Sequence, residues 1–143
     1  MALVHRDNYL DSLRRVPLFS GLDRKHLGEV AKLTTELAVA PGGVLTQAGQ
    51  HGRELMILVE GQANVERAGK PLAVLGPGGF FGELSLLDGQ PRNATVTATT
   101  ACTLLVVEQR AFAALLETVP GLDRAIMAAL CARLREAQDS PTQ

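Results

Sequence analysis

Short apolar runs separated by glycine- and proline-bearing turns make up the chain between residues 36 and 108. The runs read LAVA, GVLT, LMILVE, ANVER, LAVLG, ATVTAT and CTLLVVE, and the turns include PGG, AGQHG, EGQ, AGKP, GPGG and DGQP. Most of these runs are too short for α-helices, whereas short strands at such spacing are typical of an antiparallel sandwich or barrel, in which closure protects the sheet edges. The pattern therefore predicts an antiparallel β-roll, a jelly-roll-like barrel, with a single helical turn at residues 83–87 as the exception.

Helical periodicity precedes and follows this β segment. Residues 8–15 predict a helix that Pro17 stops, and Asp23 precedes a second helix, so residues 1–35 are expected to be helical. Residues 111–118 and 122–138 predict two further helices, separated by Pro120 and Gly121. We expect a mainly β fold with flanking helices, in a single domain over residues 1–143. Its expected parts are an N-terminal helical bundle (1–35), the β-roll (36–108) and the C-terminal helices (110–138).

Composition limits both the core and the partners. Of the 143 residues, 46% are hydrophobic and only 3% aromatic, so a core of ordinary size has to be built mostly from Leu, Val and Ala. The formal net charge of -1 provides no general field to attract nucleic acid or an anionic membrane.

Cys102 and Cys131 lie in apolar surroundings without CxxC spacing, and we expect both to be buried thiols. The N-terminus lacks a signal-peptide pattern and no apolar run approaches about 20 residues, which predicts a cytoplasmic protein without membrane contact.

The segment FFGELSLLDGQPRNATVTA, residues 80–98, combines features that suit an anionic ligand. Gly82 lets the backbone approach a ligand closely and opens the predicted helical turn, whose free N–H groups and dipole favour an anion. Arg92 follows the rigid Pro91 and offers paired donors that match phosphate oxygens. Asn93 and Ala94 then enter a strand and can offer further backbone N–H groups.

Glu83 is the residue that an anion site does not explain by itself. A carboxylate beside a phosphate is repelled unless it accepts hydrogen bonds from neutral hydroxyl groups, and a ribose 2′-hydroxyl fits that role. Glu83, Arg92 and exposed N–H groups together are chemically coherent for a sugar phosphate. Two simpler interpretations stay open: the glycine-rich turns are turns only, and Glu83 and Arg92 form a salt bridge that closes a loop.

Taken together, FGELSLL followed by PRNATVTA closely resembles the phosphate-binding cassette of the cyclic-nucleotide-binding domain family. That family includes catabolite-activator-type regulators, protein kinase A regulatory subunits and cyclic-nucleotide-gated channels. VPLFSGL is similar to the family's N-terminal turn motif, and the stretch from Pro41 through LMILVEGQANV resembles its early strands, with Gly61 at a hairpin. The terminal helices resemble its lid region, so the resemblance covers residues 10–138.

The resemblance implies a role for each part of the cassette. Arg92 pairs with the exocyclic phosphate oxygens, Glu83 accepts the ribose 2′-hydroxyl, and backbone N–H groups complete the phosphate cradle. The ligand implied is cAMP or cGMP, with cAMP favoured and without a metal. Asn93 departs from the Ala, Ser or Thr of many relatives, and because Asn can contact either the guanine amino group or the phosphate, the choice of base stays open. The ligand-binding residues expected are Gly82, Glu83, Leu84, Ser85, Arg92, Asn93, Ala94 and Arg133.

Arg133 is included as the lid residue that stacks on the base, with Leu130 and Leu134 as the next choices. A solvated helix charge at Arg133 is the competing interpretation. The apolar stripe of this last helix can bury against the β-roll or against a second copy, which leaves a homodimer open.

Catalysis and metal binding find little support in the sequence. His5, His26 and His51 lack paired ligand spacing, so no metal site is predicted. Ser85 has no neighbouring histidine to activate it, and no nucleophile with its base is found. We therefore expect no catalytic residue and no enzyme; a phosphodiesterase is disfavoured because metal ligands are missing.

The expected output is a signal to a partner. Family transcription factors append a winged helix-turn-helix after the lid helix, and residues 139–143 are too few to form one, so an unidentified protein partner and no direct DNA binding are expected. The favoured hypothesis is a stand-alone cyclic-nucleotide sensor without its own effector domain, which signals by rearrangement of the lid helix. The alternative is a structural or interaction protein with the same fold that does not bind nucleotide. Intact Glu83 and Arg92 argue against it, since an unpaired buried arginine is costly.

Overall fold

The computed structural model describes residues 10–139, apart from the side chains of residues 83–85 and 137–139. Its strands are β1 (Thr35–Val39), β2 (Val44–Thr46), β3 (Glu54–Glu60), β4 (Ala63–Arg67), β5 (Lys70–Leu75), β6 (Phe80–Phe81), β7 (Thr95–Ala98) and β8 (Cys102–Glu108). Its helices are the 3₁₀ turn η1 (Pro17–Phe19), α2 (Arg24–Leu33), α3 (Glu83–Asp88), α4 (Gln109–Thr118) and α5 (Leu122–Asp139), and residues 10–14 are also helical.

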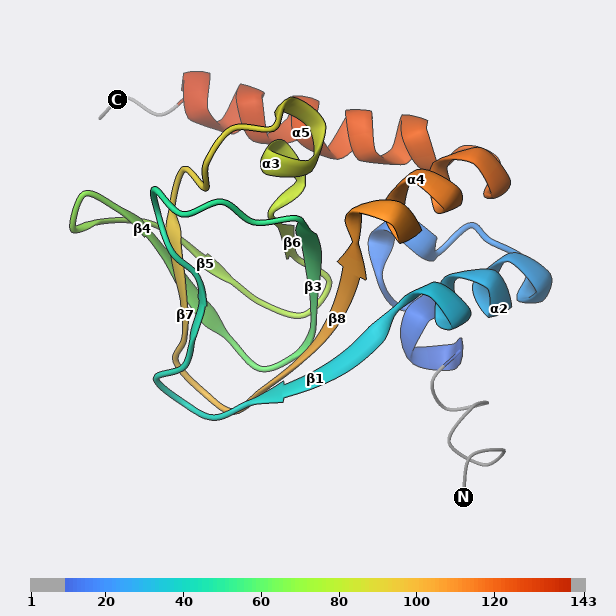
Figure 1. The fold of residues 1–143 in the computed structure, drawn as a ribbon, viewed down its shortest axis with the longest axis horizontal. Helices are drawn as coiled ribbons and strands as arrows, with labels where there is room; N and C mark the ends of the chain where they lie inside the picture. Colours follow the sequence, from blue (N-terminus) through green and yellow to red (C-terminus); the bar gives the residue numbers. More distant parts are fainter. Residues whose placement is uncertain (1–9, 140–143) are drawn as a thin grey trace.

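The strands form two four-stranded antiparallel sheets (Figure 1). The first sheet has the order β1-β8-β3-β6, and the second has the order β2-β7-β4-β5. Most neighbouring strands come from distant parts of the chain, since Thr35 pairs with Val106 and Val44 pairs with Thr97, whereas β4 and β5 form a hairpin. The predicted mainly β fold with flanking helices is confirmed, and the roll consists of two separate sheets that do not close into one barrel.

The first sheet is the middle layer of the molecule. Successive side chains of a strand point to opposite faces of its sheet, and β3 is buried on both faces. Leu55 and Ile57 face the helices. Met56 and Leu58 face the second sheet. The sequence LMILV is therefore apolar without interruption because each face of this strand meets a different core.

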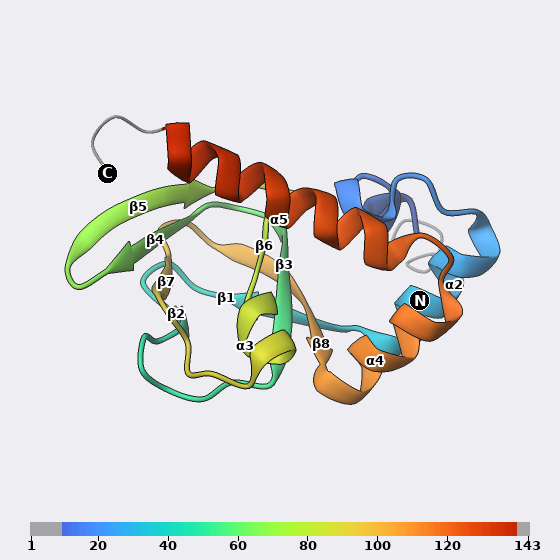
Figure 2. The same cartoon turned by 90° about the horizontal axis from the view of Figure 1, so that it is seen from above.

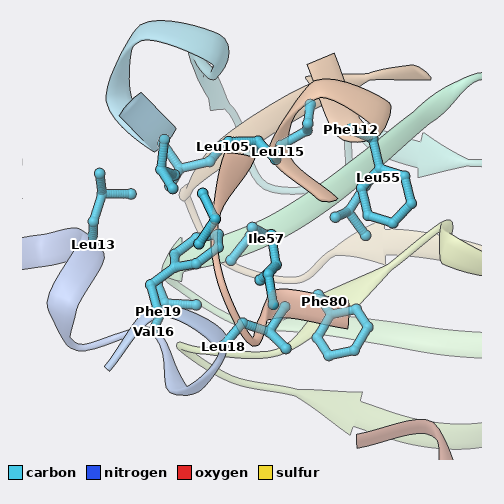
Figure 3. Packing of buried hydrophobic residues seen from close by; sticks show 14 of the residues in the cluster. Leu13, Val16, Leu18, Phe19, Leu55, Ile57, Phe80, Leu105, Phe112 and Leu115 are labelled. Atoms are coloured by element: carbon cyan, nitrogen blue, oxygen red, sulfur yellow. The ribbon is translucent and has the colours of Figure 1, made fainter. Parts of the chain in front are cut away.

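Each side of the first sheet has its own core. The helix-side core, part of which Figure 3 shows, consists of Leu10, Leu13, Val16, Leu18, Phe19, Leu27, Val30, Leu55, Ile57, Phe80, Leu105, Val107, Phe112, Leu115, Val119, Leu122 and Ile126. The inter-sheet core consists of Met56, Leu58, Ala63, Phe81, Val96, Ala98, Cys102 and Leu104. The N-terminal turn, α2, α4 and α5 all pack on the first of these cores, so the helices cover one face of the first sheet.

Local signals explain where the helices begin and end. The Asp23 carboxylate accepts a hydrogen bond of 2.9 Å from the His26 N–H and caps α2, as its position in the sequence predicts. That bond, with the nearby His26 ring, lowers the pKa of Asp23 below its usual value. Between α4 and α5, Gly121 adopts a φ of +82°, which allows the chain to reverse after Pro120.

The stripe predicted on α5 is buried only in part. Leu122 and Ile126 belong to the helix-side core and Leu130 packs at its border, whereas Leu134 is 63% exposed. Cys131 lies on the exposed side of this helix, so the prediction of two buried thiols is correct for Cys102 and wrong for Cys131. The error arose because apolar neighbours in sequence occupy several faces of a helix.

Among the described residues, no helix has the length and apolar content needed to cross a membrane.

Candidate functional site

The main chain of Arg92 is attached to the loop that joins β2 to β3. The Gly49 N–H donates to the Arg92 carbonyl at 2.8 Å, and the Arg92 N–H donates to the Gln50 carbonyl at 2.8 Å. Arg92 itself lies in the loop between α3 and β7. Two loops distant in sequence are thereby joined at one end of the roll, and the backbone of Arg92 is fixed.

The Arg92 side chain is buried, with 7% of its surface exposed. Its Nη1 donates to the Gly82 carbonyl at 3.0 Å, and its Nη2 donates to the Glu54 carbonyl at 2.9 Å. Gly82 follows β6 and Glu54 begins β3, both in the first sheet, whereas Arg92 leads into β7 of the second sheet. The guanidinium therefore connects the two sheets at the end of the roll.

Two glycines border this guanidinium. Gly82 has a φ of +92°, and a Cβ added there would lie 2.6 Å from Arg92 Nη1. A Cβ added at Gly52 would also meet the guanidinium, at three of its atoms and well inside the 3.0 Å that real Cβ contacts respect. The Gly82 backbone therefore lies close to Arg92, whereas its close approach to a ligand stays a prediction.

The helical turn predicted at residues 83–87 is α3, which starts directly after Gly82. The half-buried Leu86 packs against the helix-side core and holds the turn in place. Glu83, Leu84 and Ser85 form the start of α3, but their side chains lie outside the described part of the structure. The contact between Glu83 and a ribose therefore stays a prediction, and so do the contacts of Leu84 and Ser85.

Asn93 and Ala94 follow Arg92 and precede β7. The Arg67 Nε, at the end of β4, donates to the Asn93 carbonyl at 2.9 Å. The Thr46 hydroxyl donates to the Ala94 carbonyl at 3.4 Å. These bonds orient the main chain directly after Arg92 by anchoring it to β2 and β4 of the second sheet.

Arg133 comes to the same region from α5, which runs from the side of α2 and α4 toward the end where the β4–β5 hairpin lies (Figure 2). Its guanidinium carbon lies 4.3 Å from the centre of the Phe80 ring, and its Nη2 donates to the Phe80 carbonyl. Arg133 is half-buried and contacts Phe80, and its stacking on a base stays a prediction. Because Phe80 lies in β6, two residues before Gly82, this contact links α5 to the strand that leads into α3.

Three members of this arrangement were not predicted from the sequence: Gly52, the Glu54 carbonyl and the short strand β6. The turn AGQHG carried a signal, because two glycines just before a buried strand favour close backbone packing. No pattern could reveal the Glu54 carbonyl, since backbone acceptors are present at every residue. Within the described residues there is no cluster of three or more His, Cys, Asp or Glu side chains that could hold a metal ion.

Comparisons with known proteins identify the family of this domain. The family description of the cyclic nucleotide-binding domain matches residues 36–119. A cyclic nucleotide-gated potassium channel of Mesorhizobium japonicum is 37% identical over 105 residues, which are 73% of this chain and 29% of the channel. A cAMP-dependent protein kinase regulatory subunit of Yarrowia lipolytica is 33% identical over 116 residues, or 80% of this chain and 31% of that protein.

Among solved structures, the catabolite activator protein of Thermus thermophilus superposes with a TM-score of 0.79 at 31% identity, over 85% of this chain and 60% of that one. The chain spans only about a third of the two curated relatives, at 29% and 31% of their lengths. The likeness therefore concerns one domain of those proteins. The matched residues include β2 to β8 and all of β1 after Thr35, together with the loop of Gly52 and the segment from Gly82 to Arg92. This chain belongs to the cyclic nucleotide-binding domain family, a family of sensing and regulatory domains.

Proposed function

We propose that this domain binds a cyclic nucleoside monophosphate, with cAMP preferred to cGMP, beside Arg92 at the end of the roll. The observation that carries the proposal is the buried Arg92 guanidinium, held against the main chain that leads into α3. A guanidinium stays charged when it loses water, and its planar fork of donors matches phosphate oxygens. The adjacent start of α3 adds partial positive charge from backbone N–H groups.

Prior fixation of Arg92 favours binding. Its main chain is held by Gly49 and Gln50 and its side chain by the carbonyls of Gly82 and Glu54. Ordering a long side chain on binding costs about 0.5–1.5 kcal/mol, and a side chain that is already ordered avoids most of that cost. In this proposal Glu83 accepts the ribose 2′-hydroxyl, and Gly82, Asn93 and Ala94 supply backbone N–H groups to the phosphate.

A second candidate keeps the fold without a nucleotide, as a structural or interaction domain. One observation favours it: both guanidinium bonds described above end on main-chain carbonyl oxygens, so Arg92 has partners within the protein. An intact Arg92 is therefore not evidence against this candidate, because its guanidinium has partners without a ligand. The two candidates differ in whether Arg92 acts on a ligand or only on the two sheets.

Calorimetric titration of the chain with cAMP and with cGMP separates the candidates. We expect both to bind, cAMP more tightly, and Arg92→Ala to weaken cAMP binding roughly 30- to several-thousand-fold, as truncating one partner of a charged pair does. Arg110→Ala, the same change at an exposed position of α4, is the matched control and should leave affinity unchanged. If neither nucleotide binds at millimolar concentration, the structural candidate is correct.

The melting midpoint gives an independent measurement of the same proposal. A ligand that binds only the folded state stabilises it by about 2.7 kcal/mol at a hundred times its dissociation constant. For a domain of this size, the midpoint should then rise by roughly 5–15 °C.

Glu83→Gln should weaken binding less than Arg92→Ala but should reduce discrimination against 2′-deoxy-cAMP. Undiminished discrimination would remove the ribose role from Glu83.

The proposal also assigns a lid role to α5. Arg133 connects α5 to Phe80, which directly precedes the segment FGELSLL. A ligand that moves this segment therefore changes the position of α5 on the sheet. We expect the base to be covered by α5, with Arg133 as the stacking residue, and the moved helix to be the surface that a partner protein reads. Hydrogen exchange in residues 122–138 should slow when cAMP is added. Protection confined to residues 80–98 would exclude a lid.

A further inference from the structure

We infer that Gly52 is a positioning residue that sets the orientation of the Arg92 guanidinium. The inference rests on the proposed role of Arg92 in binding phosphate. The proposed site assigns Gly52 no ligand contact of its own, so its effect would be exerted through Arg92. Three features of the structure carry this inference: the wrapping of one loop around Arg92, the contact at Gly52, and the ordinary backbone of Gly52.

The loop from Gly49 to Glu54 wraps around Arg92. Gly49 and Gln50 bind its main chain, and the Glu54 carbonyl binds its Nη2 at 2.9 Å. Gly52 lies between these attachment points. The loop is therefore anchored to Arg92 on both sides of Gly52, and neither Gly52 nor the Arg92 backbone can withdraw without breaking these bonds.

Gly52 lies directly against the guanidinium. A Cβ at this position would meet Arg92 Nε, Nη2 and Cζ, all inside the 3.0 Å that real Cβ contacts respect. The Gly82 carbonyl also accepts from Nη1 at 3.0 Å. Two glycines thus border the guanidinium, and the absence of a side chain at Gly52 provides its space. A Cβ at Gly52 has to be accommodated by rotation of the Arg92 side chain, because the main chain of Arg92 is held by hydrogen bonds.

Gly52 offers a cleaner test than Gly82. The φ of Gly82 is +92°, so any side chain there strains the backbone as well as touching Arg92. Gly52 has no such φ, and the contacts of its added Cβ are with the Arg92 guanidinium. Gly21, where an added Cβ meets nothing within 4 Å and φ is again ordinary, provides the matched Gly→Ala control.

The experiment is a double-mutant cycle read by calorimetric titration with cAMP. Gly52→Ala should weaken binding at least about tenfold, and by no more than Arg92→Ala does. In an Arg92→Lys background, where the planar fork is replaced by a compact ammonium group, Gly52→Ala should cost about twofold or less. Gly21→Ala should leave affinity unchanged in both backgrounds. Equal loss in both backgrounds, or no loss beside native Arg92, overturns the inference.

A measurement without ligand keeps this inference separate from the proposed function. In ¹⁵N spectra of the nucleotide-free protein, Gly52→Ala should shift the Arg92 Nε–H resonance and speed its exchange with water, whereas Gly21→Ala should do neither. An unchanged Arg92 resonance overturns the inference even if cAMP binds. If the resonance moves but Arg92→Ala leaves cAMP binding unaltered, Gly52 positions Arg92 and the proposed phosphate role of Arg92 fails.

Discussion

The helix-side core and the inter-sheet core meet at the same strand, β3, but they are built differently. The helix-side core gathers large side chains from η1, α2, α4 and α5, including Phe19 and Phe112. The inter-sheet core is made by strands alone, and two of its members are alanines. The second sheet also leaves Val44, Leu72 and Val74 exposed. The second sheet is therefore held by less apolar contact, and polar bonds at the end of the roll contribute more to its attachment.

The largest losses of stability should come from truncating two neighbouring residues of β3, one in each core. Ile57 and Leu58 are both fully buried, on opposite faces of β3, so Ile57→Ala and Leu58→Ala should each lower the free energy of unfolding by about 2–5 kcal/mol. Urea denaturation measures the loss. Hydrogen exchange should then distinguish them: α4 and α5 exchange faster in the first variant, and β4 and β7 in the second. The same exchange pattern in both variants would mean that the cores act as one.

Arg92→Ala should have the next largest effect on the protein without ligand. The change removes two hydrogen bonds from a charged donor to carbonyls of the first sheet, and bonds to charged groups contribute about 1.5–3 kcal/mol. Urea denaturation should show a loss in that range, with faster exchange in β7. Arg67→Ala removes one exposed bond to Asn93 and should cost less. A loss from Arg67→Ala that equals the loss from Arg92→Ala would contradict the view that Arg92 joins the sheets.

Arg133→Ala should have a smaller effect, limited to the helix side. The change removes a cation–π contact with Phe80, worth about 0.5–2 kcal/mol, together with one hydrogen bond. Hydrogen exchange in the C-terminal half of α5 should speed up while β4 and β7 stay protected. Arg135→Ala, at an exposed position of the same helix, is the control. Unchanged protection of α5 would show that the apolar contacts of Leu122 and Ile126 hold this helix without Arg133.

The smallest effect should come from the charge that caps α2. The pKa of Asp23 is lowered in the folded protein, chiefly by the bond from the His26 N–H. The charge therefore contributes stability above the ordinary carboxyl pKa, and this contribution is lost as pH falls through the lowered value. Asp23→Asn keeps a capping acceptor but no charge. Its melting midpoint should lie slightly below the native one at pH 6 and should converge with it in acid. A gap that persists at the lowest pH would show that the charge is not its cause.

Much of the secondary structure could be predicted from the sequence because its signals are local. The strands other than β6 coincide with the apolar runs, and Asp23, Pro120 and Gly121 mark helix boundaries. β6 has two residues, too few for a period-two pattern to emerge. The order of strands was not predictable, since the pairing of Thr35 with Val106 depends on the packing of the entire chain.

The candidate site likewise has features with a local sequence signal and features that depend on contacts between distant segments. Gly82 and Arg92 were expected to share one cradle, and the structure brings them into direct contact. The Glu54 carbonyl, 38 residues before Arg92, also binds the guanidinium, and no side-chain pattern exists for a backbone atom. Arg133 was selected by resemblance to a lid, but its contact with Phe80 depends on how α5 crosses the roll. The residue types of one segment predicted its chemistry, whereas contacts between distant segments could be identified only from the three-dimensional structure.

The two cysteines differ in exposure, which provides a direct test of whether α5 moves when a nucleotide binds. Cys102 is 3% exposed and its thiol donates to the carbonyls of Gln62 and Thr100, whereas Cys131 is exposed on α5. A maleimide dye or a nitroxide should therefore attach to the natural chain at one thiol, without an engineered cysteine. The label would sit two residues before Arg133, on the helix expected to move. Its emission or spectral line shape would follow nucleotide binding in real time on otherwise unaltered protein.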